Sequence, residues 1–159
     1  MKQPARITSQ YRAPFGPVTF TVQDGHVINV ELLKESSGKN PGAEKLPAVR
    51  NMKRYLDDYF SSRQPAHPKL FIQGTEFQKR IWETMLKIPP GQIRTYGELA
   101  RELHTGSRAV AQACRCNPLP LIIPCHRVVA ANGIGGFMGK RQQVDVKRWL
   151  LAHEGVHVH

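Results

Sequence analysis

The chain is poor in acidic residues and cysteine, and it has no long apolar run. Only 12 Asp and Glu stand against 23 Lys and Arg in 159 residues, which leaves a formal net charge of +11. The three cysteines, Cys114, Cys116 and Cys125, fall within twelve residues. An odd and clustered set is a poor disulfide framework and suits a reducing compartment. The longest apolar stretch, "LPLIIP", is too short to span a membrane.

Other features that the sequence lacks narrow the class of protein. The start, "MKQPARITSQ", has no apolar core of a secretory signal, so we expect a cytoplasmic, nucleoid-associated location. There is no internal repeat, Gly-rich phosphate loop or low-complexity segment. With 40% hydrophobic and 22% charged residues, the composition is typical of a globular protein with one ordinary domain or two small ones.

The excess of positive charge is the first functional signal. A small basic protein of pI near 10 favours a polyanionic partner, and nucleic acid is the leading candidate. The alternative is a basic surface without a dedicated partner. Charge alone leaves both interpretations open.

Two segments of different character divide the chain. Apolar and polar residues alternate over 18–22, and strand-like composition resumes over 27–32 after a "DG" turn, which predicts a hairpin. Apolar residues at helical spacing predict a helix over 46–62. The Pro-rich "RQPAHPK" then predicts a linker. We therefore place an N-terminal α/β domain at 1–70 and a C-terminal domain at 71–159.

The C-terminal part is predicted to be helical. Thr75 can cap a helix that ends at "PPG", and two short helices follow around an "HTG" turn, which is the outline of a helix-turn-helix. We expect Ser107 to cap the second of these helices. Arg108, Gln112 and Arg115 share one of its faces, which suggests contact with DNA. The alternative is the solvated polar face of an amphipathic helix.

The motif "PCHRV" places a histidine directly after a cysteine. A cysteine reacts as its thiolate, so Cys125 needs a nearby base or cation, and that base needs an orienting group. Neighbouring residues on a strand point to opposite faces, so His126 needs a turn or a bridging water to reach the sulfur. Glu154 follows an apolar helix in "WLLAHEG", and a buried carboxylate needs a partner. We predict that Glu154 orients His126.

Three other interpretations of this cysteine compete. A structural role is common after an apolar run, because free cysteine is among the most buried residue types. A zinc site is disfavoured by the C-x-C spacing; it would draw on Cys114, Cys116, Cys125 and His126. A papain-like protease is disfavoured because its histidine lies far from its cysteine in sequence.

The segment "IPCHRVV" resembles the active-site signature of the O6-alkylguanine-DNA alkyltransferases, also called methylated-DNA–protein-cysteine methyltransferases. The blocks "FQKRIWETMLKIPPGQIRTYGELA", "SRAVAQACRCNPLPLIIPCHRVV" and "KRWLLAHEG" resemble the family in order and spacing, over about residues 75–155. The resemblance implies an α+β fold: a small β-rich, ribonuclease H-like N-terminal domain, then a helix-turn-helix DNA-binding domain that carries the cysteine.

The resemblance implies direct-reversal DNA repair without a cofactor or a metal. A methyl or other alkyl group would pass from O6-alkylguanine, and also from O4-alkylthymine, in flipped-out duplex DNA to Cys125. The thioether product has no route off the protein, so each molecule would act once. The implied partner is double-stranded DNA that contains O6-alkylguanine, with no membrane involved, and we expect a monomer in solution.

The resemblance also assigns roles to individual residues. His126 would be a water-mediated base oriented by Glu154, Asn117 would support the active-site turn, and Tyr96 would contact the flipped nucleotide and help to protonate guanine. The second helix would enter the minor groove, with Arg108 filling the gap left by the base. Small side chains that permit this approach are Ala109, Ala111 and Ala113. The base pocket would use the carbonyls of Cys125 and Val128, the amide of Met138, and the walls Pro120 and Trp149.

The chain departs from the family pattern after the signature. Phe137 stands where a tyrosine is usual, and Lys140 stands at the second of two glycines. We expect a changed alkyl-size preference or reduced sensitivity to bulky guanine-base inhibitors. Some members bind zinc through N-terminal cysteines, and none occurs here before residue 114, so no such site is predicted.

Two rival functions belong to other classes. A non-enzymatic, alkyltransferase-like protein would bind the damage without removing it, but such proteins lack the cysteine. A transcriptional regulator would use alkylation as a signal, but this chain is short for an added sensor domain.

Overall fold

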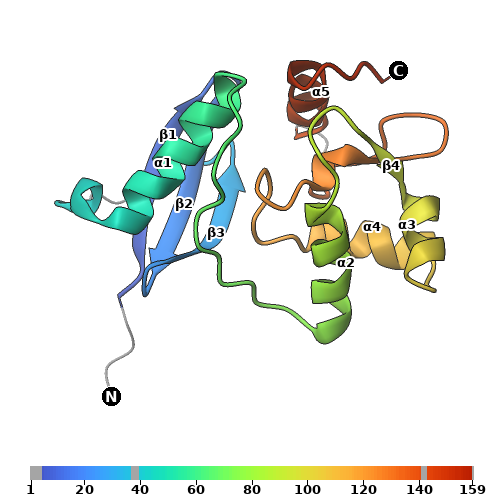
Figure 1. Cartoon of the computed structure of the whole chain (residues 1–159), viewed down its shortest axis with the longest axis horizontal. Helices are drawn as coiled ribbons and strands as arrows, with labels where there is room; N and C mark the ends of the chain where they lie inside the picture. The colour runs from blue at the N-terminus through green and yellow to red at the C-terminus, as the bar shows by residue number, and fades with distance from the viewer. Residues whose placement is uncertain (1–4, 37–39, 141–142, 159) are drawn as a thin grey trace. The chain divides into compact units, whose positions relative to one another are not determined.

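The computed structural model describes residues 5–36, 40–140 and 143–158. The chain divides into two compact units, residues 1–73 and 74–159 (Figure 1). The boundary expected from the sequence lay at residue 70. Within the described ranges, no helix combines the length and apolar character that crossing a membrane requires.

The first unit is built on an antiparallel sheet in the order β1-β2-β3. Its strands are β1 (Ile7–Ala13), β2 (Gly16–Gln23) and β3 (His26–Leu32). The predicted hairpin joins β2 to β3, and both residues of its turn, Asp24 and Gly25, have positive φ, as a type I′ turn requires. The sequence did not predict β1, because its buried positions are the small residues Ser9 and Ala13.

A single long helix supplies the other half of this core. The helix α1 (Pro47–Phe60) follows the short 3-10 turn η1 (Ala43–Lys45) and lies across one face of the sheet (Figure 1). Its buried side chains are Val49, Met52, Tyr55, Leu56 and Tyr59. This is the helix predicted over 46–62, and its apolar stripe packs onto the sheet.

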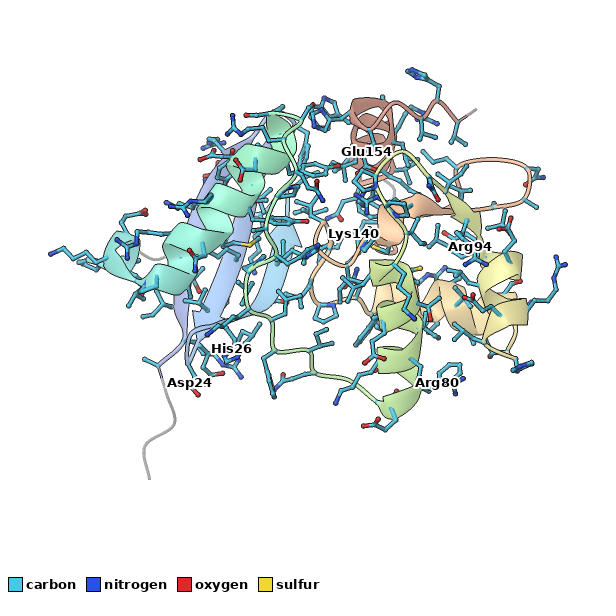
Figure 2. All side chains as sticks on the ribbon, viewed as in Figure 1. Asp24, His26, Arg80, Arg94, Lys140 and Glu154 are labelled. Atoms are coloured by element: carbon cyan, nitrogen blue, oxygen red, sulfur yellow. The ribbon has the colours of Figure 1, made fainter. Side chains whose placement is uncertain are left out.

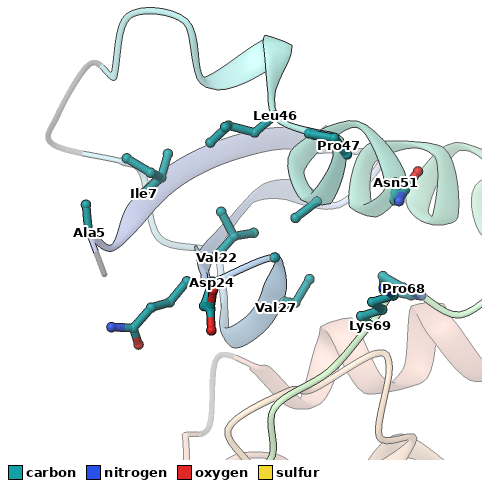
Figure 3. Close-up of a pocket in the computed structure, with 13 residues that line it drawn as sticks. Ala5, Ile7, Val22, Asp24, Val27, Leu46, Pro47, Asn51, Pro68 and Lys69 are labelled. Atoms are coloured by element: carbon teal, nitrogen blue, oxygen red, sulfur yellow. The ribbon is translucent and has the colours of Figure 1, made fainter. Parts of the chain in front are cut away.

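The first unit also contains a cavity of 620 Å³ between the tip of the hairpin and the start of α1 (Figure 3). Apolar side chains such as Val22, Val27 and Leu46 line most of it, together with Asn51 and Lys69. Leu46 lies at its rim and is 38% exposed.

The second unit is mainly helical. Its elements are α2 (Glu76–Leu86), β4 (Arg94–Thr95), α3 (Tyr96–Glu102), α4 (Ser107–Arg115), the 3-10 turn η2 (Cys125–Arg127), β5 (Val128–Val129) and α5 (Val144–His153). Thr75 caps α2 in a capping box with Gln78, as its position predicted. The prediction that Ser107 caps α4 is wrong: Gly106 holds the extended N-cap conformation, and Ser107 is already the first helical residue.

Two contacts position the helix pair α3–α4 around the cysteine. The indole Nε1 of Trp82 on α2 donates to the carbonyl of Ala113 on α4 at 2.9 Å. The short strands β4 and β5 pair in parallel, with Arg94 opposite Val128. Because β5 directly follows η2 and β4 directly precedes α3, this pairing sets the start of α3 beside the cysteine segment.

Candidate active site

Cys125 lies in a tight turn rather than in a strand. It begins η2, after Pro124, and its side chain is 2% exposed. The irregular backbone supplies the turn that adjacent cysteine and histidine side chains need if they are to act at one place. The neighbouring His126 is 0% exposed.

Asn117 holds the segment that leads to the cysteine. Its Nδ2 donates to Cys125 Sγ at 3.1 Å and to the carbonyl of Ile123 at 2.9 Å. Its Oδ1 accepts from the amide of Leu119 at 2.9 Å. The side chain thus closes the loop between α4 and η2 and orients the sulfur.

The thiol is protonated in the free protein at neutral pH. Burial raises the pKa of Cys125 to about 11, although the hydrogen bond from Asn117 and the charge of Lys147 oppose the shift. The thiolate is the nucleophilic form. Cys125 therefore has to lose its proton as part of any reaction.

His126 is arranged to receive such a proton. Its Nε2 lies 2.8 Å from Glu154 Oε2, and because a carboxylate only accepts, Nε2 carries the hydrogen and Nδ1 the lone pair. Burial lowers the pKa of His126, against the influence of Glu154, so the ring is neutral. Among the described residues, Nδ1 has no hydrogen-bond partner. This atom is an available base.

Arg127 completes this network, and the sequence analysis missed it. Its Nε and Nη2 donate to the two oxygens of Glu154 at 2.8 and 2.9 Å, and its Nη1 donates to the carbonyl of Ile88 at 2.7 Å. Burial alone would raise the pKa of Glu154, but the bonds from His126 and Arg127 hold it well below its usual range. The signal was present in "PCHRV", since a buried carboxylate calls for a cation.

Lys147 is a second residue that the sequence analysis missed. Its side chain is 0% exposed, and Nζ donates to the carbonyls of Val128 and Gly136 at 2.7 and 2.8 Å and to Tyr96 Oη at 3.5 Å. Burial lowers the pKa of Lys147 to about 8. Its helical spacing from Leu150 and Leu151, which are both buried, was the available signal.

Tyr96 is the first residue of α3, where the β4–β5 pairing places it. Its hydroxyl donates to the carbonyl of Gly136 at 3.4 Å, and Lys147 Nζ lies 5.7 Å from the centre of its ring. Burial raises the pKa of Tyr96, so its hydroxyl stays protonated and can donate. Tyr96 and Lys147 form a pair of proton donors near the cysteine segment.

A cavity of 310 Å³ opens beside this donor pair. Its lining includes Tyr96, Ala111, Cys114, Arg115, Phe137, Met138 and Lys140. Phe137 is 3% exposed and forms part of the wall. Cys125 is not among the described residues that line the cavity, but its Sγ lies 3.8 Å from Met138 Sδ. Figure 2 labels Lys140 in the loop before α5 and Glu154 at the end of that helix.

The remaining predicted pocket residues lie elsewhere in the second unit. Pro120 and Val128 are buried, and neither lines the described cavity. Trp149 stacks on His153 with ring centres 5.0 Å apart, also outside that lining. The structure therefore brings Tyr96, Phe137 and Met138 to the cavity, and it places the other three in the surrounding framework.

The exposed face of α4 carries the predicted DNA contacts. Arg108, Gln112 and Arg115 are exposed, and Ala109 is partly exposed. The expectation that Ala113 permits close approach to DNA is wrong, because it is 2% exposed and faces Trp82. Arg115 reaches from the exposed face of the helix to the cavity rim.

The zinc interpretation finds no support in the geometry. Within the part of the chain that the structure describes, no three His, Cys, Asp or Glu side chains gather as metal ligands. Cys114, Cys116 and Cys125 are free thiols. The site instead combines a buried thiol, an oriented neutral imidazole, two proton donors and an exposed basic helix. This set suits transfer of a group from a polyanion to sulfur.

Comparisons with known proteins agree with this chemistry. The family model described as 6-O-methylguanine DNA methyltransferase, DNA binding domain, matches residues 76–156. A methylated-DNA–protein-cysteine methyltransferase of Methanosarcina acetivorans is 34% identical over 91% of this chain and 96% of the relative. One of Methanosarcina mazei is 37% identical over 81% of this chain and 82% of the relative.

Solved structures of O6-methylguanine methyltransferases are also similar to this chain. The O6-methylguanine methyltransferase of Mycobacterium tuberculosis superposes with a TM-score of 0.80 at 30% identity, covering 94% of this chain and 93% of the other. M. tuberculosis OGT in complex with DNA gives 0.79 at 32% identity, covering 93% and 92%.

Proposed function

The chain belongs to the methylated-DNA–protein-cysteine methyltransferases, and from this premise we propose that it removes alkyl groups from guanine O6 in DNA by taking them onto Cys125. The family resemblance and the α+β fold expected from the sequence are confirmed. One observation carries the assignment to Cys125: its sulfur is held by Asn117 and adjoins a histidine whose Nε2 is fixed by Glu154.

In this proposal the target nucleotide leaves the base stack and enters the cavity beside Tyr96. Extrusion costs a few kcal/mol, which contacts between the basic protein and phosphates offset. Arg108, exposed at the start of α4, fills the gap left in the duplex, and α4 approaches through the minor groove. The DNA complex of the M. tuberculosis relative supports DNA as the partner.

The chemical step moves one alkyl carbon and one proton. The Cys125 proton passes through a water to His126 Nδ1, and Glu154 stabilises the imidazolium that forms. The sulfur then attacks the alkyl carbon, an S–C bond forms and the C–O6 bond breaks. The electron pair stays on the guanine, which takes a proton from Tyr96, and Lys147 stabilises the resulting phenolate.

The reaction ends with a stable thioether in a buried site. The S–C bond of a thioether is not activated toward displacement, because no group of the site turns the cysteine sulfur into a good leaving group. Each molecule is therefore consumed by one repair event. The same pocket chemistry extends to O4-alkylthymine, whose alkylated oxygen is also a leaving group that a donor can protonate. Because the substrate is DNA, the proposal includes a nucleoid-associated location, and it includes a monomer in solution.

The direct test is a duplex that contains a single O6-methylguanine. We expect the intact mass to rise by one methyl in place of one hydrogen, and the modified peptide to contain Cys125. Cys125→Ser should bind the same duplex without accepting the methyl group, whereas the exposed control Cys116→Ser should accept it at the wild-type rate. DNA binding without any modification of Cys125 in the wild type would instead favour a damage-binding protein.

A further inference from the structure

The side chain of Met138 lies between the nucleophile and the cavity. Met138 lines the cavity, and its Sδ is 3.8 Å from Cys125 Sγ, whose S–H points to it. Cys125 itself is 2% exposed and lies outside the described lining. A group that enters through the cavity therefore meets the thioether of Met138 before it meets the thiol.

The backbone at this position is unusual for a methionine. Met138 has φ of 54°, in the left-handed region that residues with a side chain seldom adopt. The next residue, Gly139, also has positive φ, at 70°. A non-glycine residue in this region costs about 1 kcal/mol, so the fold holds the methionine here against a local preference. The result is a side chain directed at the sulfur.

Methionine is well suited to a barrier that opens. It is unbranched, has three rotatable side-chain bonds, and fills irregular space with little cost in changing rotamer. Met138 is partly exposed at the cavity, so its side chain has room to move outward. Phe137, by contrast, is buried and fixed in the wall.

We propose that the Met138 side chain is a displaceable plug, which shields Cys125 in the free protein and, when pushed aside, limits the size of the alkyl group that reaches the sulfur. The shielding is a property of the free protein. The size limit rests on the proposed function, because it concerns alkyl groups delivered by a flipped base.

The shielding is tested with iodoacetamide, a small electrophile that needs no DNA. The Cys125 thiolate attacks its methylene carbon, iodide leaves, and the thiol proton goes to solvent. Peptide mass spectrometry reads Cys125 separately from Cys114 and Cys116. We expect Met138→Ala to speed modification of Cys125 by about tenfold or more, since both access and thiolate fraction rise. The matched control Met138→Leu keeps the bulk and should stay within about twofold of wild type.

The size limit is tested with duplexes that carry O6-methylguanine or O6-benzylguanine. In Met138→Ala, the ratio of benzyl to methyl transfer rates should rise by about tenfold over wild type, and in Met138→Leu it should stay unchanged. Both rates are single-turnover measurements at saturating protein.

Glycine provides a second variant in case alanine is poorly tolerated at this backbone conformation. Met138→Gly removes the side chain and relieves the left-handed backbone, so it should be at least as stable as wild type in thermal unfolding.

Equal iodoacetamide rates in wild type and Met138→Gly overturn the proposal that Met138 is a plug. An equal acceleration in Met138→Leu and Met138→Gly overturns it too. An unchanged benzyl-to-methyl ratio overturns the size limit. If wild type transfers no alkyl group from DNA, the proposed function fails, while the iodoacetamide comparison still decides the plug.

Discussion

The two units each contain a cavity, and the contrast between them shows what marks an active site. The cavity at the hairpin tip of the first unit measures 620 Å³, and the cavity beside Tyr96 in the second unit measures 310 Å³. The larger one is lined mainly by apolar side chains, and no thiol or buried ionisable group occurs in its described lining. The smaller one is lined by Tyr96, and the side chain of Met138 separates it from Cys125. Convergent chemistry, rather than volume, identifies the site.

The largest difference between the units should appear in alkyl transfer itself. Cys125→Ser should abolish transfer, because a hydroxyl in this environment is a far weaker nucleophile than a thiol. Leu46→Ala, at the rim of the larger cavity, should transfer at the wild-type rate. Single-turnover assays with an O6-methylguanine duplex measure both. A loss of transfer in Leu46→Ala would show that the larger cavity takes part in the reaction.

The next difference concerns ion pairs, one buried and one exposed. Arg127→Gln leaves the buried Glu154 without its cation, so the free energy of unfolding should fall by about 3 kcal/mol. Arg63→Gln in the first unit breaks a pair with Asp58 whose arginine side chain is 63% exposed, and it should change stability by less than about 0.5 kcal/mol. Urea unfolding at neutral pH compares the two.

The stabilities of wild type and Arg127→Gln should also depend differently on pH. The folded pKa of Glu154 lies below its unfolded value, so its pairing stabilises the protein above about pH 4 and the contribution is lost as pH falls toward the folded pKa. In Arg127→Gln the folded pKa of Glu154 moves up toward the unfolded value, so this loss should be smaller than in wild type and complete at a higher pH. Identical acid unfolding curves for the two proteins would contradict the role given to Arg127.

A smaller effect is expected from the buried lysine. The pKa of Lys147 is about 8, so its charge, which supports Tyr96 as a donor, disappears as pH rises through that value. Wild-type transfer should slow above about pH 8, whereas Lys147→Met should be about tenfold slower at neutral pH and show no such decline. Lys69→Met, at the larger cavity, is the control and should follow wild type. A decline in Lys147→Met equal to that of wild type would assign the titration to another group.

The smallest effect concerns the cavity wall. Phe137 is 3% exposed, so Phe137→Tyr adds a hydroxyl that has to find a partner near the bound base. We expect the ratio of methyl to benzyl transfer rates to change by about threefold, in line with one polar contact. Rates that are indistinguishable from wild type for both substrates would remove Phe137 as a determinant of substrate size.

Local patterns predicted the parts of the fold that depend on neighbours in sequence. The "DG" hairpin, the apolar stripe of α1 and the Thr75 cap each involve residues a few positions apart. Strand β1 was missed because Ser9 and Ala13 are small and give no apolar alternation. Its burial depends on pairing with β2, which no local pattern records.

The residues of the site also divide into those that local sequence patterns predicted and those that they did not. Cys125 and His126 stand in a recognisable motif, and Glu154 follows an apolar helix, so all three could be named from the sequence. Arg127 and Lys147 were missed because a charged side chain is expected to face solvent. Their burial depends on partners far along the chain, the carboxylate of Glu154 and the carbonyl of Gly136.

Asn117 links the reacting cysteine to the end of helix α4. It follows the C-cap residue Cys116 of α4, its backbone amide donates to the carbonyl of Cys114 on that helix, and its side chain donates to the reacting sulfur. An alkylated sulfur is bulkier than a thiol, so alkylation of Cys125 should weaken the hydrogen bond from Asn117. The same residue anchors the end of α4, whose exposed face carries Arg108, Gln112 and Arg115. A change at the sulfur therefore reaches the end of α4 through a single side chain.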